Sequence, residues 1–251
     1  MINVKTEEEI QIMRQGGKIL ASVLWEVLSQ AKPSVSELEL DELAQKLIRK
    51  HGAEPGFQKV PGYKHTICVS TNDVVVHGIP TGYRLKENDV VGIDCGVFYK
   101  GFHTDMAETI KVQSLDDDVG RFLETGKRAL EEGIKVVRMG NRIGHISKTI
   151  QDIVERDGGY SVVRSLVGHG VGRELHEDPE VPGFLRGPIE KTPLLQEGMT
   201  IAIEVIYNMG KPDVVYRGND NWTIVTKDGS LSGVFERTVV IAREGSVVLT
   251  A

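Results

Sequence analysis

Two stretches of this chain, 106 positions apart, carry the same order of features, and this internal repeat limits the folds open to it. Each stretch begins with a long amphipathic helix, continues with a shorter helix that stops at a glycine, and then becomes strand-like. Leu24 corresponds to Leu130, and the stop glycine Gly52 corresponds to Gly158. Amphipathic helices align with one another easily, but a stop glycine at the same offset favours a genuine repeat.

The repeat predicts a single domain over residues 1–251, with pseudo-twofold symmetry and halves of about 1–112 and 113–251. Thr6 and Glu9 form a capping box that predicts the start of the first helix. We expect further helices from Ser36 and over 119–138 and 147–157, and strands at 66–70, 90–98, 200–207, 222–225 and 234–241. Short loops join several of these strands, which favours a mostly antiparallel sheet in a mixed α/β (α+β) domain. The proline-rich segment 179–193 is expected to be irregular.

The charge balance and the lack of long apolar runs exclude several classes of protein. The chain has 30 basic and 36 acidic residues and a net charge of −6, whereas binders of nucleic acid or anionic membranes carry a basic surplus. No stretch reaches the roughly 18 apolar residues that cross a bilayer, and the polar N-terminus lacks the apolar segment of a signal peptide. We therefore expect a cytoplasmic protein with free thiols at Cys68 and Cys95 and with no membrane or specific nucleic-acid partner.

Five ionisable residues, spread over more than half of the chain, have the chemistry of one metal site. They are Asp94, Asp105, His169, Glu204 and Glu236. Their four carboxylates and one imidazole carry a formal charge of −4, which two divalent cations would neutralise. Hard oxygen ligands with one nitrogen suit Mn²⁺, Fe²⁺, Co²⁺ or Zn²⁺ and disfavour Cu(I) or an iron–sulfur cluster. The fold must therefore bring these five side chains together.

The two aspartates are placed for a β-hairpin. Ten residues separate Asp94 from Asp105, centred on Tyr99 and Lys100, and Gly101 is available for the positive φ of a three-residue loop. In such a hairpin the aspartates lie roughly opposite each other, with Cβ atoms about 4.5–5.5 Å apart. Two carboxylates this close repel unless a cation lies between them. The alternative is a pair of exposed aspartates on a surface hairpin.

The two glutamates each interrupt an apolar strand. Alternation places Glu204 on the face opposite Ile203 and Val205, and Glu236 repeats the situation. A glutamate in such a strand is costly to bury unless it is paired or binds a metal. For Glu236 a salt bridge, for example with Arg237, is the alternative, although neighbours on a strand point to opposite faces.

Three histidines are candidates for the same site. His169 lies among three glycines, which predict a tight, poorly shielded turn where a metal can approach the imidazole closely. A dinucleotide-binding fingerprint is the weak alternative there, because the glycine spacing and a strand–helix unit are lacking. His77 and His176 are not needed as ligands and could donate to a substrate carbonyl or an oxyanion. Partly exposed loop histidines are the alternative for these two.

A two-metal site of this composition implies hydrolysis. Such sites hold their ions about 3.5–4 Å apart and bridge them with a water whose pKa falls towards about 7. The bridging water then supplies a hydroxide nucleophile at neutral pH.

At these residues the chain resembles the pita-bread metallopeptidases, and most closely the type I methionine aminopeptidases. The resemblance runs nearly end to end, from the segment 5–10 to the last strand. Its most specific pieces are the segments 72–80, 168–172 and 176–179, the five metal-site residues and Trp222. Only 34 residues separate His169 from Glu204, which leaves no room for the helical insertion of the type II enzymes.

The resemblance implies a pita-bread fold, an antiparallel sheet covered by two pairs of helices, and removal of the initiator methionine from nascent proteins whose second residue is small. It implies one metal held by Asp94, Asp105 and Glu236, and a second held by Asp105, His169, Glu204 and Glu236. It gives Glu204 the role of proton shuttle and places His77 and His176 on the substrate peptide and the tetrahedral intermediate. The methionine side chain would lie among Phe57, Tyr63, Cys68 and Trp222, whose apolar and sulfur-bearing surface suits a thioether. The family works near the ribosomal exit, although no basic patch in this chain argues for docking there.

Several positions depart from the family pattern. Leu175 stands where an aromatic residue usually lines the methionine pocket, and Phe57 stands where a small residue is common. Val205 replaces the usual proline after Glu204, and Arg237 replaces the histidine that usually follows the last glutamate. The first pair bears on side-chain selectivity and Arg237 on metal preference, while all five candidate ligands are intact.

Two other functions compete with this one. A prolidase or aminopeptidase P shares the fold, but those enzymes usually carry an additional N-terminal domain, for which Asp94 comes too early. A metal-free pita-bread scaffold that binds peptides or proteins is the second alternative. Scaffolds of that kind lose ligands and gain charged tails, and this sequence shows neither.

Overall fold

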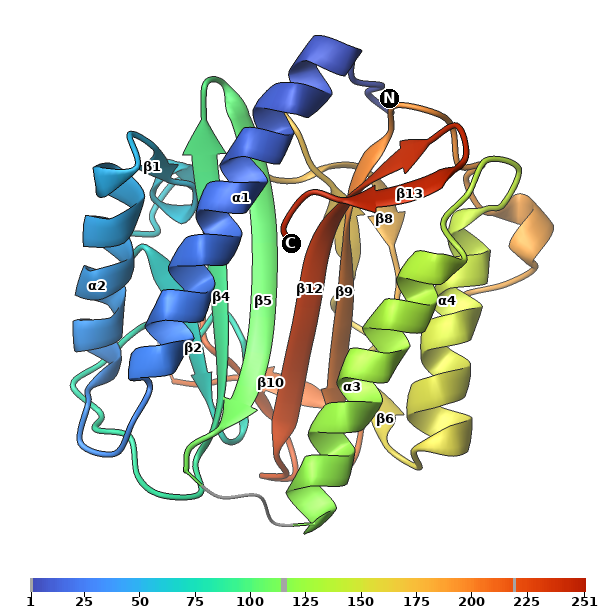
Figure 1. The fold of residues 1–251 in the computed structure, drawn as a ribbon. Coiled ribbons are helices and arrows are strands. Elements are labelled where there is room, and N and C mark those ends of the chain that lie inside the picture. The colour runs from blue at the N-terminus through green and yellow to red at the C-terminus, as the bar shows by residue number, and fades with distance from the viewer. Residues whose placement is uncertain (1, 114–116, 219) are drawn as a thin grey trace.

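Four helices lie on one face of a large β-sheet in the computed structural model, which describes residues 2–113, 117–218 and 220–251 (Figure 1). The first pair is α1 (Glu7–Gln30) with α2 (Glu37–Lys50), and the second is α3 (Asp117–Lys135) with α4 (Ile143–Gln151). A single π-helical turn, η2 (Asp152–Asp157), continues α4. This arrangement confirms the expected fold class, an antiparallel sheet under two pairs of helices. None of the helices in the described ranges is long and apolar enough to cross a membrane.

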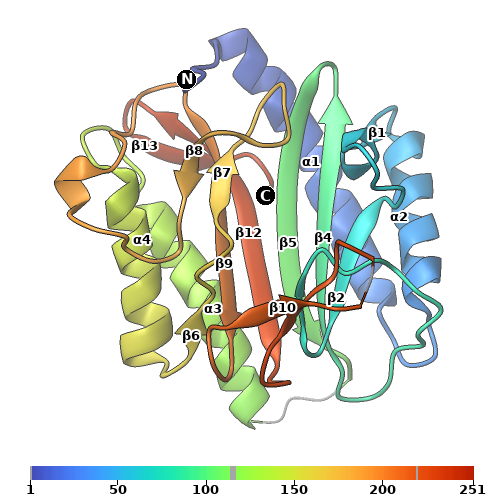
Figure 2. The same ribbon diagram turned by 180° about the vertical axis from the view of Figure 1, so that it is seen from behind.

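The main sheet has ten strands, and every neighbouring pair in the described ranges is antiparallel. Its central order is β1-β4-β5-β12-β9-β7-β8, while β2 pairs with β4, β6 with β9 and β13 with β12. The bounds are β1 Glu54–Pro55, β2 Ile67–Thr71, β4 Val90–Tyr99, β5 Phe102–Lys111, β6 Ser161–Val162, β7 Gly168–Gly170, β8 Glu177–Val181, β9 Thr200–Asn208, β12 Ser232–Ala242 and β13 Gly245–Val248. A second sheet of three strands, β10 (Val214–Tyr216), β11 (Ile224–Thr226) and β3 (Val74–Val76), crosses the other face (Figure 2). Two 3₁₀ turns, η1 (Phe57–Lys59) and η3 (Ile189–Lys191), complete the chain.

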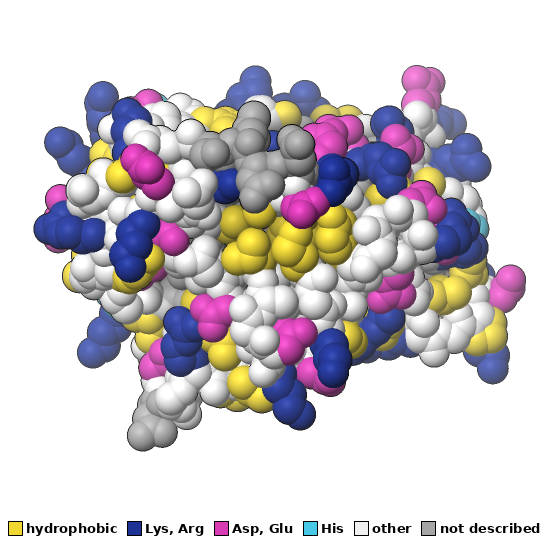
Figure 3. Space-filling view, turned by 90° about the horizontal axis from the view of Figure 1, so that it is seen from below, with side chains coloured by type: hydrophobic (Ala, Val, Ile, Leu, Met, Phe, Trp, Pro, Cys, Tyr) yellow, Lys and Arg dark blue, Asp and Glu magenta, His cyan; other side chains and the backbone are white. Residues whose placement is uncertain are grey.

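The helices cover the apolar face of the sheet. Ile93 and Val97 of β4 belong to the buried cluster under α1 and α2, whereas Ile203 and Val205 of β9 belong to the cluster under α3 and α4. Because side chains alternate along a strand, the intervening residues point to the opposite face. Figure 3 views the lower end of the molecule, where basic side chains are interspersed with acidic ones, in keeping with the balanced charges of the sequence.

The predicted helix starts are confirmed for the first two helices and wrong for the fourth. Capping boxes form at Thr6 and at Ser36. Helix α4 begins at Ile143, four residues before the predicted start. Its first turn is capped locally by His145 Nδ1, which accepts from the Arg142 N–H at 3.0 Å, and from a distance by the hydroxyl of Thr192, which accepts from the Gly144 N–H at 2.9 Å. Local sequence does not reveal the distant partner Thr192. The 106-residue offset predicts the start itself, since it relates the start of α2 at Glu37 to position 143 (37 plus 106).

The five predicted strands are present with shifted ends. The largest shifts are two residues: β11 begins at Ile224 rather than at 222, and β12 begins at Ser232 rather than at 234. The segment 179–193 is less irregular than predicted, since it contains the end of β8 and the turn η3.

The two halves of the sheet meet at a seam between β5 and β12. Regular pairing across the seam covers two residue pairs, against ten between β4 and β5 and nine between β9 and β12. On either side of these two pairs, threonine hydroxyls make hydrogen bonds across the seam. Thr109 Oγ1 accepts from the Val234 N–H and donates to the Val234 carbonyl, and Thr238 Oγ1 does the same with Asp105. The seam is therefore held largely by side-chain hydroxyls.

Candidate metal centre

Sheet register places three candidate ligands in one row across four strands. Asp94 on β4 pairs with Ala107 on β5, and Ala107 pairs with Glu236 on β12. Glu236 in turn pairs with Glu204 on β9. All lie on the face away from the helices, and the small side chain of Ala107 leaves space between the carboxylates.

The other two ligands form a second row, two residues along the strands. Asp105 pairs with Gly96, and His169 on β7 pairs with Ala202 on β9. Ala202 pairs with Thr238, whose hydroxyl binds the backbone of Asp105. Two residues of strand span about 6.5–7 Å, so the rows are near enough to share ligands around metal ions.

The β4–β5 hairpin differs from the prediction in its turn and register. The loop has two residues, Lys100 with φ 48° and Gly101 with φ 92°, and Tyr99 pairs directly with Phe102. Two successive positive φ values are typical of a type I′ turn, whose twist matches that of the strands. Asp105 therefore lies diagonal to Asp94 rather than opposite it, a position typically about 7–8 Å away and still within reach of the side chains.

His169 lies in a strand and not in the exposed turn that was predicted. Its side chain is buried, and the neighbouring glycines serve close packing of β7 between β8 and β9. A Cβ atom on Gly168 would come within 2.4 Å of the Ala202 carbonyl oxygen, and one on Gly170 within 2.2 Å of the Asp178 carbonyl oxygen. The His169 Nδ1–H donates to the Gly170 carbonyl at 2.8 Å, and Nε2 lies 3.3 Å from Glu204 Oε1. This hydrogen bond fixes the ring so that Nε2, which faces Glu204, is the nitrogen that a metal would bind in place of a proton.

The carboxylates are in an environment that disfavours their charges. Burial raises the pKa of Asp94 to about 7, and the nearby Glu204 charge adds to the rise. Burial, followed by the charges of the neighbouring carboxylates, also raises the pKa values of Asp105 and Glu236 well above the ordinary range. For His169, burial lowers the pKa, but hydrogen bonding to Glu204 and the charge of Glu204 outweigh it, so the net shift is upward. Without cations the cluster holds protons that metal ions would replace.

The site has the ligand atoms that a divalent cation needs. Asp105, His169 and Glu236 each place one ligand atom within 4.8 Å of the others. Asp94 Oδ1 and Glu236 Oε1 are buried and have no hydrogen-bond partner among the described residues. Buried carboxylate oxygens without partners are costly, so these two atoms fit a bound cation.

His77 and His176 flank the rows from two different segments. His77 follows β3 with a left-handed φ of 56°, which is uncommon for a non-glycine residue. Burial chiefly lowers the pKa of His77. His176 is exposed at the edge of the site, and its ring centroid lies 4.4 Å from that of His169. Partial burial of the imidazole is the main cause that lowers its pKa, followed by the nearby His169 and His77. Both imidazoles are therefore neutral near pH 7 and each has one N–H to donate.

An apolar pocket adjoins the carboxylate rows. Phe57, Tyr63, Cys68 and Leu175 form its buried core, with Val60, Ile79 and Trp222 packed against them. The Tyr63 ring meets Trp222 edge-on at 5.1 Å between centroids and meets Phe57 at 6.3 Å. Cys68 pairs with Asp94 in the sheet, so it stands where the pocket meets the first row. Cys68 and Cys95 are both free thiols, as predicted.

One cavity of about 100 Å³ joins the rows and the pocket. It is lined by all eleven residues that the sequence singled out, namely Phe57, Tyr63, Cys68, His77, Asp94, Asp105, His169, His176, Glu204, Trp222 and Glu236. Val60, Val76 and Leu175 complete the lining.

The departures from the family pattern fall on two sides of the sheet. Phe57 and Leu175 line the cavity, whereas Val205 packs under the helices. Arg237 donates to Glu108 at 2.7 Å and to the Glu236 carbonyl at 2.8 Å. The salt bridge proposed as an alternative role for Glu236 is therefore wrong, because Arg237 is paired with Glu108.

His103 was not predicted from the sequence. It does not line the cavity, but it is near enough to His176 to lower the pKa of that ring. His103 precedes Asp105 by two positions on β5, so alternation places both on one face, and this signal was available in the sequence. His103 is 4% exposed, and burial followed by the charge of Lys59 lowers its pKa to about 4. Its backbone N–H donates to the Gly172 carbonyl at 2.6 Å, which ties β5 to the segment before His176.

Comparison with known proteins adds an independent finding. Residues 11–243 match the profile of metallopeptidase family M24. A methionine aminopeptidase of Clostridium perfringens is 43% identical over 250 residues, which cover 100% of this chain and 99% of the relative. The crystal structure of methionine aminopeptidase from Thermotoga maritima has a TM-score of 0.96 at 39% identity, covering 100% of this chain and 99% of that one. The prolidase from Pyrococcus furiosus shares the fold alone, with a TM-score of 0.79 at 23% identity over 99% of this chain and 65% of its own.

Proposed function

The chain belongs to metallopeptidase family M24, and from this membership we propose that it removes the N-terminal methionine from polypeptides whose second residue is small. The observation that carries the proposal is the single cavity in which a carboxylate cluster meets an apolar, sulfur-bearing pocket. The similarity to methionine aminopeptidases over the full chain supports the same conclusion. When the side chain of a peptide's N-terminal residue occupies the pocket, the first peptide bond lies over the carboxylate rows.

The metal part of the proposal is a pair of divalent ions, from among Co²⁺, Mn²⁺, Fe²⁺ and Zn²⁺. One ion would be held by Asp94, Asp105 and Glu236, and the other by Asp105, His169, Glu204 and Glu236. Bound divalent cations supply Lewis acidity and lower the pKa of water, which makes a nucleophile available at neutral pH. The unpartnered oxygens of Asp94 and Glu236 support this assignment.

The apolar pocket selects the substrate side chain. Phe57, Tyr63 and Trp222 offer aromatic surface, and the Cys68 thiol stands at the inner end beside Asp94. A flexible, polarisable thioether makes favourable contacts with aromatic rings and sulfur. The methionine side chain therefore anchors the substrate and orients its first peptide bond, which is the positional part of catalysis.

The remaining residues handle charge and protons. His77 and His176 are neutral donors, so their N–H groups can hydrogen-bond the carbonyl oxygen and bind it more strongly as it becomes an oxyanion. Glu204 takes a proton from the attacking water and returns it to the leaving amino group. The carbon–nitrogen bond then breaks, giving free methionine and a peptide with a new amino terminus. The 15% exposure of the Glu204 side chain keeps it open to the substrate side of the cavity.

The cellular substrates in this proposal are the N-termini of nascent polypeptides in the cytoplasm, because chains leaving the ribosome carry an unprocessed initiator methionine. Action near the ribosomal exit region follows from the same substrate. A pull-down of the protein with translating ribosomes, with and without release of the nascent chain by puromycin, tests this part separately from the chemistry.

The decisive experiment is release of free methionine from Met-Ala-Ser by metal-free protein titrated with Mn²⁺, Fe²⁺ or Co²⁺. A parallel series of Met-Xaa-Ser peptides tests the requirement for a small second residue, and Xaa-Pro-Ala tests prolidase activity. We expect metal-dependent methionine release that falls as the second residue grows. Cleavage of the proline peptide alone would move the protein to the prolidase side of the fold, and no turnover of either peptide would leave the binding scaffold.

A further inference from the structure

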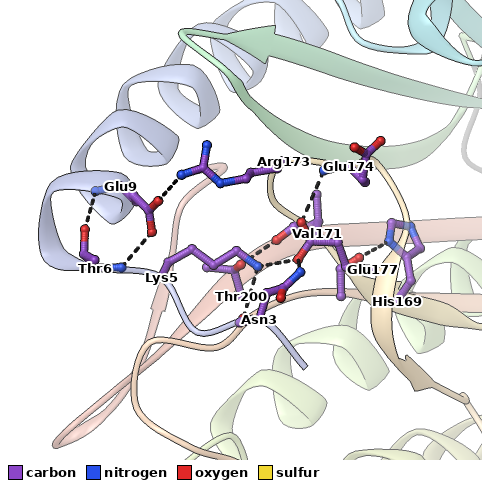
Figure 4. A network of polar contacts seen from close by, with 11 residues as sticks. Asn3, Lys5, Thr6, Glu9, His169, Val171, Arg173, Glu174, Glu177 and Thr200 are labelled. Carbon is purple, nitrogen blue, oxygen red and sulfur yellow. Dashed lines mark hydrogen bonds and ion pairs between the residues drawn. The ribbon is translucent and has the colours of Figure 1, made fainter. Parts of the chain in front are cut away.

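A buried ion pair lies beside the site and joins the N-terminal segment to β8 (Figure 4). Lys5 Nζ lies 2.6 Å from Glu177 Oε2, and each side chain is only 4% exposed. A buried ion pair is a weak source of stability, because the free energy of desolvating both charges offsets their attraction. Its more specific effect is to fix one arrangement of the groups that carry the charges.

Glu177 accepts further hydrogen bonds from the N-terminal segment and from the segment that precedes β8. Its Oε2 also accepts from Asn3 Nδ2 at 3.3 Å, and its Oε1 accepts from the Glu174 N–H at 3.2 Å. Gly172 stands where the lysine passes, since a Cβ atom there would come within 2.3 Å of Lys5 Cε and 2.7 Å of Glu177 Oε1. The ion pair therefore packs against the segment 171–176, which connects β7 to β8, and restrains its backbone.

This segment carries two residues of the cavity, Leu175 and His176. The His176 ring has no hydrogen-bond partner in the part of the chain that the structure describes, and its ring contact is the one with His169. The position of its imidazole therefore depends on the backbone, which Glu177 holds one residue later. The segment begins at Val171, whose N–H donates to the Thr200 carbonyl at 3.1 Å.

The other end of the ion pair is anchored to the strand that carries Glu204. The Lys5 N–H donates to the Gly198 carbonyl at 2.8 Å, and Val4 pairs with Met199, directly before β9. Lys5 thus connects the entrance of β9 to the segment of His176. A second contact, Arg173 with Glu9 at 2.5 Å, has side chains 66% and 22% exposed, and solvent screening makes it the weaker of the two.

We propose that Lys5 is a positioning residue: through its buried ion pair with Glu177 it sets where His176 and Leu175 lie relative to the carboxylate rows. The proposal rests on the proposed aminopeptidase function, in which His176 contacts the substrate. Lys5 does not line the cavity, so its loss is expected to act on turnover through the position of His176 and to leave metal content intact.

The first test is Lys5→Met, which keeps the length of the side chain and removes its charge. We expect kcat for methionine release to fall on the order of 10–100-fold, as a misplaced catalytic group does, with unchanged metal content. Arg186→Gln is the matched control, because it breaks the exposed Arg186–Glu180 pair at the same strand, and it should turn over like the wild type. Wild-type kcat in Lys5→Met would overturn the proposal.

The second test asks whether Lys5 acts through His176. In a double-mutant cycle, Lys5→Met added to His176→Ala should change kcat less than about twofold, because of the two cavity residues that Lys5 positions only Leu175, a wall of the substrate pocket, is left. Losses that multiply would show that Lys5 acts by another route and would overturn the assignment. If Lys5→Met does not fold, Lys5→Met with Glu177→Gln removes the unpaired buried charge as well. That variant is expected to fold with reduced kcat, and wild-type kcat in it would overturn the proposal.

A readout without turnover separates this proposal from the proposed function. The ¹H–¹⁵N signals of the His176 ring, recorded on metal-free protein, should shift in Lys5→Met and stay in place in Arg186→Gln. If the wild type releases no methionine, the proposed function fails, and the ring signals alone decide on the positioning. Unmoved ring signals in that case would overturn it.

Discussion

The two ends of the cavity are built in different ways. The charged end is built on one sheet: its five candidate metal ligands occupy two adjacent rows on β4, β5, β12, β9 and β7. The apolar end is assembled from separate pieces, with Phe57 on η1, Cys68 on β2, Leu175 before β8 and Trp222 before β11. A row in a sheet is fixed by register and alternation, so its geometry tolerates little change. A pocket made of loops and turns can change one wall at a time, which suits the end that sets selectivity.

The largest expected effect is from Asp105→Asn, which strikes the charged end where the two ion sites would share a ligand. The substitution preserves volume but removes a charge, so we expect loss of nearly all methionine release, well beyond the roughly 10–100-fold that outer-shell partners cost. Metal content by mass spectrometry and kcat with saturating Mn²⁺ or Co²⁺ measure the effect. Near-wild-type turnover would refute the shared role.

His77→Ala tests the boundary between the ends. We expect kcat to fall by about 10²–10³-fold, the usual cost of one oxyanion donor, with metal content unchanged, because in the proposed function His77 contacts substrate and is not a ligand. Steady-state kinetics and metal analysis of the same sample check this. Loss of bound metal in His77→Ala would place this residue in the charged end and contradict its role as a substrate donor.

The stability of the charged end should depend on pH in a direction set by its carboxyl groups. The pKa of Asp94 rises from 3.8 to about 7 on folding, so the folded metal-free protein holds a proton that the unfolded chain releases. Its stability therefore falls as pH rises from about 4 to about 7, on the order of a few kcal/mol for such a shift. Bound cations replace that proton and remove the loss. The lowered pKa values of His77 and His176 give the opposite pH dependence below pH 6.5, because burial disfavours their protonated forms. Their contribution is the same in the metal-free and the metal-bound protein, so it cancels when the two are compared.

The measurement is the increase in Tm on adding Mn²⁺ or Co²⁺ to metal-free protein at pH 5 and at pH 7.5. We expect a clearly larger increase at pH 7.5. Equal increases at the two pH values would mean that the carboxylates are already ionised without metal.

The smallest effect is expected at the apolar end. Phe57→Ala removes one aromatic wall and leaves the rows untouched, so KM for methionyl peptides should rise roughly 10-fold with a smaller change in kcat, as for a pocket contact. Competition between Met-Ala-Ser and Leu-Ala-Ser measures the accompanying loss of selectivity. A fall in kcat larger than the rise in KM would show that the two ends are not independent.

The same contrast explains what the sequence could predict. Alternation along strands was enough to find Asp94, Glu204 and Glu236, and it would have found His103. It could not fix the hairpin register, because one residue more or less in the turn moves Asp105 past Asp94. The start of α4 and the ion pair formed by Lys5 depend on partners such as Thr192 and Glu177, which lie far away in the sequence. The pocket residues were identified only through the family resemblance.

The roles of the site residues stay predictions that the experiments above test, and the single repeated domain stays a prediction as well. What the structure adds is that all eleven residues line one cavity.

The seam between β5 and β12 runs through the middle of the charged end. Asp94 and Asp105 lie on one side of it, and His169, Glu204 and Glu236 lie on the other. Few backbone hydrogen bonds cross the seam, so brief opening there parts the two sets of ligands. A metal ion held by both sets would bridge the opening and act as a cross-link between distant parts of the chain. Amide hydrogen exchange at Asp105 and Val234 should then slow when metal is present. The rate at which the metal dissociates then limits how often the two halves of the sheet separate.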